Sequence, residues 1–330
     1  MRDSFYFYIK QMYSPNALYD AYWRFAVDRQ NIFFRRNILH EKYPWTKNII
    51  LQKYKFTNAY RANDRVSQFL ISNIIYSSKA SIYDADDILF RILLFKIFNK
   101  ISTWQAIEGK IGDIKLYRNV FSDIEQVLDD LFAKGNTIYS GAYIMPSGKS
   151  SFGFSRKYKN HLALLKSMFE DRFAEKVLQC KTMEQLYNLL ISYPMIGSFL
   201  AYQYATDINY SDITNFSEME FVVPGPGAKS GIQKCFANSD SKVYTNIIKW
   251  VSEEQEKEFE RLGLQFHFLS GRPLQLIDCQ NLFCEFDKYA RVAYPAVHSS
   301  SGRKRIKQHF EPNKQAIDFK YPPKWHISNI

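Results

Sequence analysis

Hydrophobic side chains recur every three or four residues along most of this 330-residue chain. Between residues 16 and 39, this spacing places apolar side chains on one face of a helix and charged side chains on the other. The apolar positions are Leu18, Tyr22, Phe25, Ile32 and Phe33, and the charged positions are Arg24, Asp28, Arg29, Arg35 and Arg36. The pattern predicts a long amphipathic helix over residues 16–39.

The same spacing predicts helices over much of the remaining sequence. These segments are 63–75, 84–98, 103–108, 122–133, 158–178, 182–191, 243–261 and 282–292. Asn63 or Asp64 is suited to cap the first of them. Residues 137–145 are compatible with a strand or with a loop, and residues 146–156, rich in Ser, Gly and Lys, indicate a mobile loop. We therefore predict an all-α fold.

The length of the chain suits one large domain or two ordinary ones, and no repeat or low-complexity segment divides it. We expect one helical domain over residues 1–330, with two lobes near residues 1–150 and 151–298. We expect residues 299–330 to form a basic tail. A basic arm within it, from residue 299 to 307, carries Arg303, Lys304, Arg305 and Lys307.

Composition narrows the class of partner. The 44 Lys and Arg residues outnumber the 33 Asp and Glu residues, which gives a formal net charge of +11. This charge favours nucleic acid first and an acidic membrane surface second, but solvated basic surfaces are common enough that charge alone decides little. No apolar run is long enough to span a bilayer, and the N-terminus has no apolar signal region. We therefore expect a cytoplasmic protein without a membrane partner.

Neither the cysteines nor the histidines form a metal-binding pattern. The four cysteines contain no C-x-x-C pair, and the six histidines are scattered. We expect reduced thiols and no metal held by the protein alone. Residues 143–150 resemble the end of a phosphate-binding loop but lack its first glycine, so we do not predict a P-loop kinase site.

Residues 44–67 contain the densest group of residues suited to handling a nucleotide. Aromatic faces stack on bases, arginines bind phosphates, and Asn and Asp side chains bind polar base edges. The residues of these kinds are Trp45, Phe56, Asn58, Tyr60, Arg61, Asp64 and Arg65. An ion pair of Asp64 with Arg61 or Arg65 is the simpler interpretation of that carboxylate.

Two further segments resemble helix-hairpin-helix elements that bind DNA. Residues 193–201 read as helix, Pro-x-x-Gly turn and helix, and a plain helical corner explains them equally well. In residues 223–232, Gly225-Pro226-Gly227 bends the chain and precedes Lys229 near the start of a predicted helix, which suits an anion site. Lys229 is then a phosphate clamp or, less favoured, an amine nucleophile. An exposed lysine after a tight turn is the plain alternative.

A last group of polar residues lies at residues 276–289. Asp278 follows Ile277 before a predicted helix, as the catalytic aspartate of helix-hairpin-helix glycosylases does, but an N-cap explains it better. Glu285 and Lys288 lie three residues apart and are placed to pair on one helix face.

These residues together resemble a known family: the alpha-glutamyl/putrescinyl thymine pyrophosphorylases and the similar helical domain of 5-hydroxymethyl-deoxyuridine DNA kinases. The resemblance runs from about Tyr22 to Arg291. It is carried by Tyr22-Trp23-x-Phe25, Arg29, Ile32, Arg35-Arg36, Pro44-Trp45-Thr46, Tyr54-x-Phe56-Thr57-Asn58-x-Tyr60-Arg61-x-x-Asp64-Arg65-Val66, Phe199-Leu200-Ala201-Tyr202-Gln203, Asp207, Glu220-Phe221, Gly225-Pro226-Gly227-Ala228 and Cys284-Glu285-Phe286-x-Lys288-Tyr289.

The resemblance implies a fold like that of helix-hairpin-helix DNA glycosylases and a role in DNA base hypermodification. A flipped base derived from 5-hydroxymethyluracil in duplex DNA would exchange a phosphate or pyrophosphate at its 5-methylene group for an amine or amino acid. Mg²⁺ would accompany a phosphorylated base, and a DNA-base kinase would act in trans.

The resemblance and the residue chemistry together give a set of candidate site residues. The catalytic candidates are Asp64, Glu220, Lys229, Asp278 and Glu285, three of which (Asp64, Glu220, Glu285) are unranked candidates for the general base. The candidates for binding DNA or the base are Arg29, Arg35, Arg36, Trp45, Phe56, Asn58, Tyr60, Arg61, Arg65, Gln203, Gly225, Pro226, Gly227, Lys288 and Tyr289.

Two other functions remain open from the sequence. A DNA glycosylase that excises a modified base would depend on Asp278 or Lys229. A non-catalytic DNA-binding module, working with a kinase, would depend on basic residues and not on Asp64 or Glu285.

Overall fold

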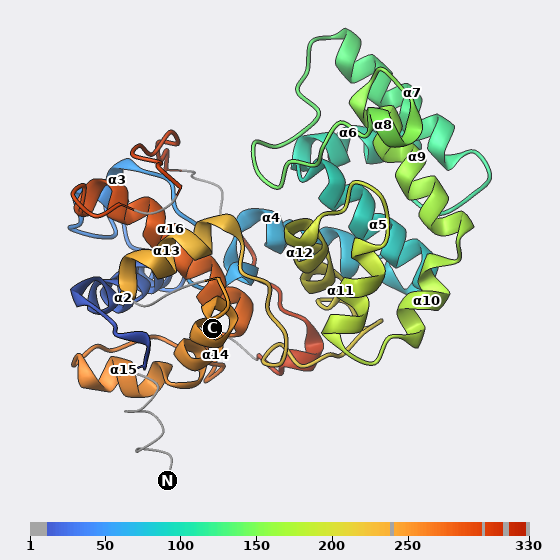
Figure 1. The fold of residues 1–330 in the computed structure, drawn as a ribbon. Coiled ribbons are helices and arrows are strands. Elements are labelled where there is room, and N and C mark those ends of the chain that lie inside the picture. Colours follow the sequence, from blue (N-terminus) through green and yellow to red (C-terminus); the bar gives the residue numbers. More distant parts are fainter. Residues whose placement is uncertain (1–11, 238–240, 299–300, 313–316, 328–330) are drawn as a thin grey trace. The chain divides into compact units, whose positions relative to one another are not determined.

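The computed structural model describes residues 12–237, 241–298, 301–312 and 317–327. Within these ranges every regular element is a helix, and β pairing is limited to three isolated bridges. The all-α prediction is therefore confirmed (Figure 1). Of the predicted basic tail, residues 299–300, 313–316 and 328–330 lie outside the described residues.

The chain divides into two compact units. Unit 1 comprises Met1–Asp64, Glu218–Asp318 and Ile327–Ile330, and unit 2 comprises Arg65–Ser217 and Phe319–His326. These boundaries differ from the division expected near residue 150, because the chain leaves unit 1 after Asp64 and returns to it at Glu218. Action of the whole chain as one functional domain stays a prediction.

Unit 1 is built around its last helix. Its elements are α2 (Ala17–Asn37), α3 (Ile49–Lys53), the 3₁₀ turn η1 (Arg61–Asn63), α13 (Pro226–Cys235), α14 (Tyr244–Glu253), α15 (Gln255–Arg261) and α16 (Leu276–Ala293). Helices α2, α3, α13 and α14 all contact α16. Tyr22 of α2 stacks on Phe283 of α16 with ring centroids 4.3 Å apart, and both side chains are buried. The helix predicted over 16–39 is thus present, with Asn16 as its N-cap.

Helices α13 and α16 lie side by side in this unit (Figure 1) and pack closely. A Cβ atom at Gly227 would lie 2.3 Å from Sγ of Cys284, and one at Gly231 would lie 2.1 Å from the carbonyl oxygen of Phe283. One turn further along, Nζ of Lys234 lies 3.0 Å from Oδ1 of Asp287, with both side chains at most 2% exposed. The glycines allow the two helices to approach closely. The buried ion pair fixes their register, because removing either partner would leave an uncompensated buried charge.

Unit 2 surrounds the apolar helix α5 (Ala85–Phe98), which Asp84 caps by accepting from the N–H of Asp87. Its other elements are α4 (Arg65–Phe69), the π-helix η2 (Leu70–Ile75), η3 (Ala80–Ile82), α6 (Ile101–Ile111), α7 (Val120–Ala133), α8 (Lys149–Phe152), α9 (Lys157–Glu170), α10 (Phe173–Gln179), α11 (Met183–Ile191), α12 (Ser198–Ile208) and η4 (Pro323–Trp325). Helices α6, α9, α10 and α12 and the π-helix all contact α5.

Two charges that interrupt the apolar run of α5 are buried and satisfied. Arg91 donates to the carbonyl oxygens of Ile74 (3.3 Å) and Ile114 (3.1 Å). Nζ of Lys96 lies 3.3 Å from Oδ2 of Asp207 on α12, and both side chains are at most 2% exposed. Each charge therefore ties α5 to a neighbouring segment of unit 2.

The structure differs from the sequence-based helices at several points. The segment 63–75 is a 3₁₀ turn, a short α-helix and a π-helix, and the segment 158–178 is broken where Arg172 adopts a left-handed conformation with φ of 57°. The segment 243–261 ends one helix and begins another at Glu254. Helix α16 starts six residues before the predicted 282, residues 137–145 form a loop, and residues 146–156 include α8.

The two predicted helical hairpins have different outcomes. Residues 193–201 do join two helices, α11 and α12, through a turn with Met195 at φ of 69° and Gly197 as N-cap. Residues 209–225 contain no helix before α13, so the hairpin predicted around Gly225 is wrong. A single helix starts there, and its glycines serve close packing on α16.

Substitution of Gly231 by alanine tests the packing of α13 on α16. We expect a loss of about 1–3 kcal/mol in the free energy of unfolding, because the new methyl group would push against the backbone of α16. Chemical denaturation monitored by circular dichroism measures it. Gly109→Ala is the matched control: it lies within α6 with nothing inside 4 Å of an added Cβ, so it should stabilise by up to about 1 kcal/mol. Equal effects of the two substitutions would contradict the packing account.

Candidate functional site

The loop of residues 56–64 in unit 1 is held along α16 by two carboxylates of that helix. The N–H of Arg61 donates to Oδ1 of Asp278 at 2.7 Å. The N–H of Thr57 donates to Oε2 of Glu285 at 2.9 Å. The two carboxylates are seven residues apart, about two helical turns, so they project from the same side of α16. The backbone of the loop is therefore fixed at two points.

The loop also closes on itself through Asn58. Its backbone N–H donates to Oδ1 of Asp64 at 2.9 Å, and its side-chain Nδ2 donates to the carbonyl oxygen of Asn63 at 2.7 Å. These bonds place the carboxyl group of Asp64, the last residue of the loop, beside its first residues.

Arg29 of α2 holds the start of the loop through hydrogen bonds. Its guanidinium donates to the carbonyl oxygens of Thr57 (2.9 Å) and Phe56 (3.3 Å) and to Oδ1 of Asn58 (3.4 Å). The side chain is 7% exposed, and this burial lowers the pKa of Arg29, while the negative charges of Glu285 and Asp64 act in the opposite direction.

Lys288 completes the group. Its Nζ lies 2.8 Å from Oε2 of Glu285, one turn along α16, and 4.9 Å from the centre of the Phe56 ring. We call Arg29, Asn58, Asp64, Glu285 and Lys288 the carboxylate cluster. It contains two acids and two bases, from α2, the loop and α16.

Within the carboxylate cluster, Asp64 has a carboxyl group whose pKa is strongly raised. Burial raises the pKa of Asp64 to about 7, and the negative charge of Glu285 adds to this effect. The N–H of Asn58 and the positive charges of Arg29 and Arg61 oppose it. Asp64 is only partly buried by its neighbours. A carboxyl group whose pKa lies near neutral pH is suited to general acid–base catalysis.

The structure separates the other candidate carboxylates from this role. Asp278 is 5% exposed, and both its oxygens accept backbone N–H groups, from Arg61 and, at 3.0 Å, from Gln275. Asp278 is therefore not the N-cap of α16, which is Gln275, but the N3 residue that completes its capping box. Glu220 is exposed and lies in the non-helical segment before α13. Glu285 is in the carboxylate cluster, where it accepts from Thr57 and pairs with Lys288.

The aromatic candidates for base stacking are buried in the structure. Trp45 and Phe56 are each 8% exposed and Tyr60 is 2% exposed. The indole N–H of Trp45 donates to the carbonyl oxygen of Glu41, and the hydroxyl of Tyr60 donates to that of Arg272. Their burial in this conformation gives the stacking role no support, because each ring already serves the packing of unit 1.

The candidate arginines occupy different environments. Arg35 is exposed and donates to the carbonyl oxygen of Trp45, and Arg36 lies over the ring of Trp45, 5.0 Å from its centre. Arg61 is 2% exposed. Arg65 is exposed and begins unit 2. Arg35, whose Nε lies 4.0 Å from Oε2 of Glu41, and Arg65 are therefore the exposed ones.

The predicted anion site at residues 225–229 is packed on α16. The N–H of Gly225 donates to Oε1 of Gln280 at 3.1 Å, and Gly227 faces Cys284 closely. Pro226 and Lys229 are exposed. The glycines have a packing function here, and only Lys229 keeps the surface position that a phosphate clamp needs.

Two remaining binding candidates belong to different units. Gln203 is fully buried in α12 of unit 2. Tyr289 of α16 is half-buried, and its hydroxyl accepts from Nδ2 of Asn48 at 3.0 Å. In the described conformation Gln203 is inside the core of its unit and Tyr289 lies at the edge of unit 1.

Sequence reasoning missed several residues that shape the site. Thr57 binds Glu285 through its backbone N–H, which no side-chain pattern signals, and its hydroxyl is buried without a hydrogen-bond partner. Asn48 caps α3 and binds Tyr289. In unit 2 the pair of Lys96 and Asp207 was also missed, although a lysine inside an apolar run is a signal for a buried partner.

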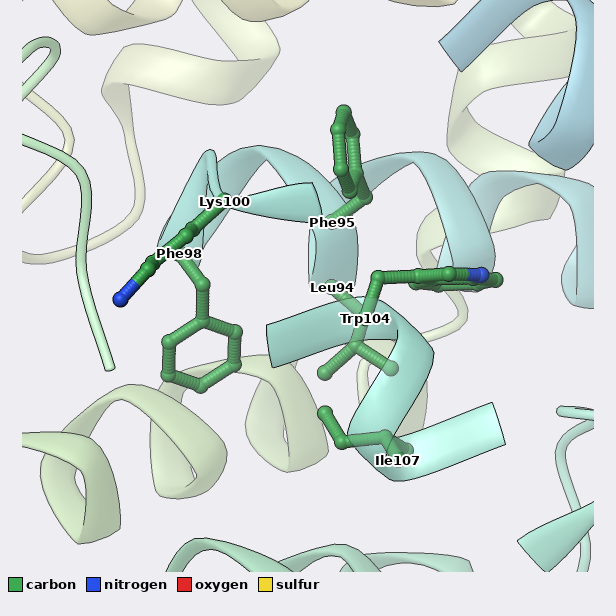
Figure 2. A pocket seen from close by; sticks show the side chains of 6 residues that line it. All are labelled: Leu94, Phe95, Phe98, Lys100, Trp104 and Ile107. Carbon is green, nitrogen blue, oxygen red and sulfur yellow. The ribbon is translucent and has the colours of Figure 1, made fainter. Parts of the chain in front are cut away.

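The described ranges offer no metal centre in place of the carboxylate cluster. No group of three or more His, Cys, Asp or Glu side chains there is placed to hold a metal ion. A small hollow in unit 2 is lined by Leu94, Phe95, Phe98, Lys100, Trp104 and Ile107, with the Lys100 amine directed away from the rings (Figure 2). Its apolar lining offers no chemistry. Across the residues described, no helix combines the length and hydrophobicity needed to cross a membrane.

The fold and site define an all-helical protein in which α16 holds the loop of residues 56–64 and the carboxylate cluster lies where they meet. The chain belongs to the family described as "5-hmdU DNA kinase, helical domain", which matches residues 16–299. It is 27% identical over 287 residues to a protein of Bacillus phage SP10 named "5-hmdU DNA kinase". The match covers 83% of this chain and 45% of that relative. No solved structure matches, so likeness to helix-hairpin-helix glycosylases stays a prediction.

Replacement of Asp278 tests its role as a structural anchor. Asp278→Ala leaves the buried N–H groups of Arg61 and Gln275 without their acceptor, and we expect a loss of roughly 2–4 kcal/mol in unfolding free energy. Denaturant unfolding measures it. The exposed Glu220→Ala is the control and should change stability by less than about 0.5 kcal/mol. A stable Asp278→Ala protein would refute the anchor.

Replacement of Asp64 tests its raised pKa. In the folded protein the pKa is about 7, against 3.8 for an unperturbed aspartate. The folded state holds this proton more tightly than the unfolded state does. The free energy of unfolding therefore falls as the pH rises from the pKa of the unfolded state to the pKa of the folded state. Asp64→Asn should therefore stabilise the protein more at pH 8 than at pH 5, by roughly 1–3 kcal/mol. Thermal unfolding of both proteins at both pH values measures this, and a gain independent of pH would contradict the raised pKa.

Proposed function

We propose that this chain takes part in the modification of 5-hydroxymethyluracil in DNA. Two findings support the proposal. The chain belongs to the family described as "5-hmdU DNA kinase, helical domain", and its phage relative is named "5-hmdU DNA kinase". The chain spans 45% of that relative, so the activity of the whole relative is carried over here only as part of the proposal. The net charge of +11 suits a DNA partner.

The reaction we propose is substitution at the 5-methylene carbon of a phosphorylated or pyrophosphorylated base. The nitrogen of an amine or amino acid forms a bond to that carbon, the carbon–oxygen bond to the phosphate or pyrophosphate breaks, and the amine loses a proton to a general base. The observation that carries this proposal is the half-buried residue Asp64, which the N–H of Asn58 holds beside Glu285 and whose carboxyl pKa is raised to about 7. A base with this pKa is half deprotonated near neutral pH, where it is most effective.

The neighbours of Asp64 suit the charges of such a reaction. Glu285 carries a negative charge that attracts a cationic amine, and Lys288 beside it is a partner for the leaving phosphate. Asn58 holds Asp64 in place through its backbone N–H. The target base must leave the DNA stack to reach a carboxyl group, which costs a few kcal/mol. Exposed Arg35 is suited to a backbone phosphate during that step.

A second candidate function is presentation of the base to a kinase. The name of the phage relative favours it. In that case the hydroxyl of 5-hydroxymethyluracil attacks the terminal phosphate of a nucleotide, and Mg²⁺ enters with that nucleotide. A glycosylase is less well supported, because both oxygens of Asp278 are bound to backbone N–H groups.

Mass spectrometry of nucleosides and released bases distinguishes these functions. Duplex DNA that contains 5-hydroxymethyluracil, or its phosphorylated form, is incubated with the protein and a pool of amines, with and without ATP and Mg²⁺. A heavier thymidine derivative from the phosphorylated substrate supports substitution. A phosphorylated nucleoside that requires ATP supports the kinase function, and a free base with an abasic site refutes both.

The pH dependence of the reaction tests the role of Asp64. We expect the single-turnover rate of wild-type protein to rise with pH and to level off above an apparent pKa near 7, because only the carboxylate accepts the proton. Asp64→Asn should lower the rate by roughly 10²–10⁴-fold and remove this rise. Glu220→Gln, an exposed carboxylate of the same charge, is the control and should keep the profile. An unchanged profile in Asp64→Asn would rule Asp64 out as the base.

A further inference from the structure

Part of the basic tail pairs with unit 1 just before the loop of residues 56–64. The N–H of Lys55 donates to the carbonyl oxygen of Gln308 at 3.1 Å, and the N–H of Phe310 donates to that of Lys53 at 3.0 Å. These bonds form an antiparallel bridge between Tyr54 and His309. Residues 308–310 therefore run beside residues 53–55, which lead directly into the candidate site.

Three side-chain and backbone contacts fix this segment in addition to the bridge. Ile306 is 8% exposed and anchors its middle. The carbonyl oxygen of Arg305 accepts from Nη1 of Arg291 at 3.3 Å. Phe310 lies 6.3 Å from the rings of both Tyr43 and Trp45, measured between ring centres. The segment is thus held against the rest of unit 1 from residue 305 to residue 310.

The seated segment carries charges that have no acidic partner. The exposed cations along it and its paired segment are Lys53, Lys55, Arg303, Lys304, Arg305 and Lys307. Within the described part of the chain, none of them is in an ion pair. Elsewhere many exposed lysines are paired, for example Lys79 with Asp113 at 2.6 Å and Lys176 with Asp171 at 2.6 Å. Unpaired charges held together repel one another, and an anionic partner relieves that repulsion.

We infer that these six cations, which we call the basic ridge, bind the phosphate backbone of duplex DNA beside the candidate site. This inference rests on the proposed function for its choice of polyanion. Lysine and arginine side chains supply the sequence-independent part of DNA binding by neutralising phosphates. The family match ends at residue 299, so four of the six cations lie beyond it.

The test compares two variants of the full chain with the same change in charge. The ridge variant combines Arg303→Ala, Lys304→Ala, Arg305→Ala and Lys307→Ala. The control variant combines Lys79→Ala, Lys166→Ala, Lys176→Ala and Lys257→Ala, four exposed lysines that are each paired with an acid. Fluorescence anisotropy with an unmodified 20-base-pair duplex at several salt concentrations gives the slope of log affinity against log salt.

The ridge variant should bind more weakly at low salt, and its slope should be smaller than that of wild type by roughly 2–4, since each phosphate contact contributes about 0.9. The control variant should keep most of the wild-type slope. Equal slopes for the two variants, or no DNA binding by wild type, would overturn the inference. The inference would also be overturned if the ridge variant lost the ability to bind vesicles containing phosphatidylserine but bound DNA as wild type does.

The outcome is separable from that of the proposed function. Product formation with an unaffected salt slope in the ridge variant would overturn the basic ridge alone. A reduced slope with no product from wild-type protein would overturn the proposed reaction and leave the basic ridge in place.

Discussion

The candidate site depends on two carboxylates of α16 that bind backbone N–H groups of one loop. Asp278 holds Arg61, and Glu285 holds Thr57. Hydrogen bonds to a charged acceptor are stronger than neutral ones, and they fix the backbone without regard to the side chains it carries. With the backbone fixed, Asp64 is positioned next to Glu285, and the interaction of these two acids helps to keep a proton on Asp64 at neutral pH.

Helix α16 is itself positioned by its contact with α13. Gly227 and Gly231 let the two helices approach until a methyl group no longer fits between them, and the buried pair of Lys234 and Asp287 sets their register. A shift of α16 by one turn would move Glu285 by about 5.4 Å and release the loop. The chemistry proposed for Asp64 therefore rests on packing at a distance from it.

The sequence predicted the fold class and most helices because their apolar periods are strong, as for α2 and α5. It did not predict the breaks at Arg172 and Glu254, since these depend on local backbone conformation. For the site, it named Asp64 and Glu285 as candidates but could not rank them, because separation along the chain does not give distance in space. Thr57 was missed as a site residue, since it acts through its backbone. The glycines at 225 and 227 were assigned to phosphate, whereas they pack on α16.

The central claim is that the loop held by α16 makes Asp64 a base poised near neutral pH at a DNA site. Its most direct test is the titration of the Asp64 side-chain carboxyl carbon by NMR, assigned by comparison with Asp64→Asn, with and without a duplex that contains 5-hydroxymethyluracil. The account predicts a pKa near 7 in the free protein and a change in the Asp64 resonance when the duplex binds. A pKa near 4 and a resonance that is unaffected by bound duplex would contradict it.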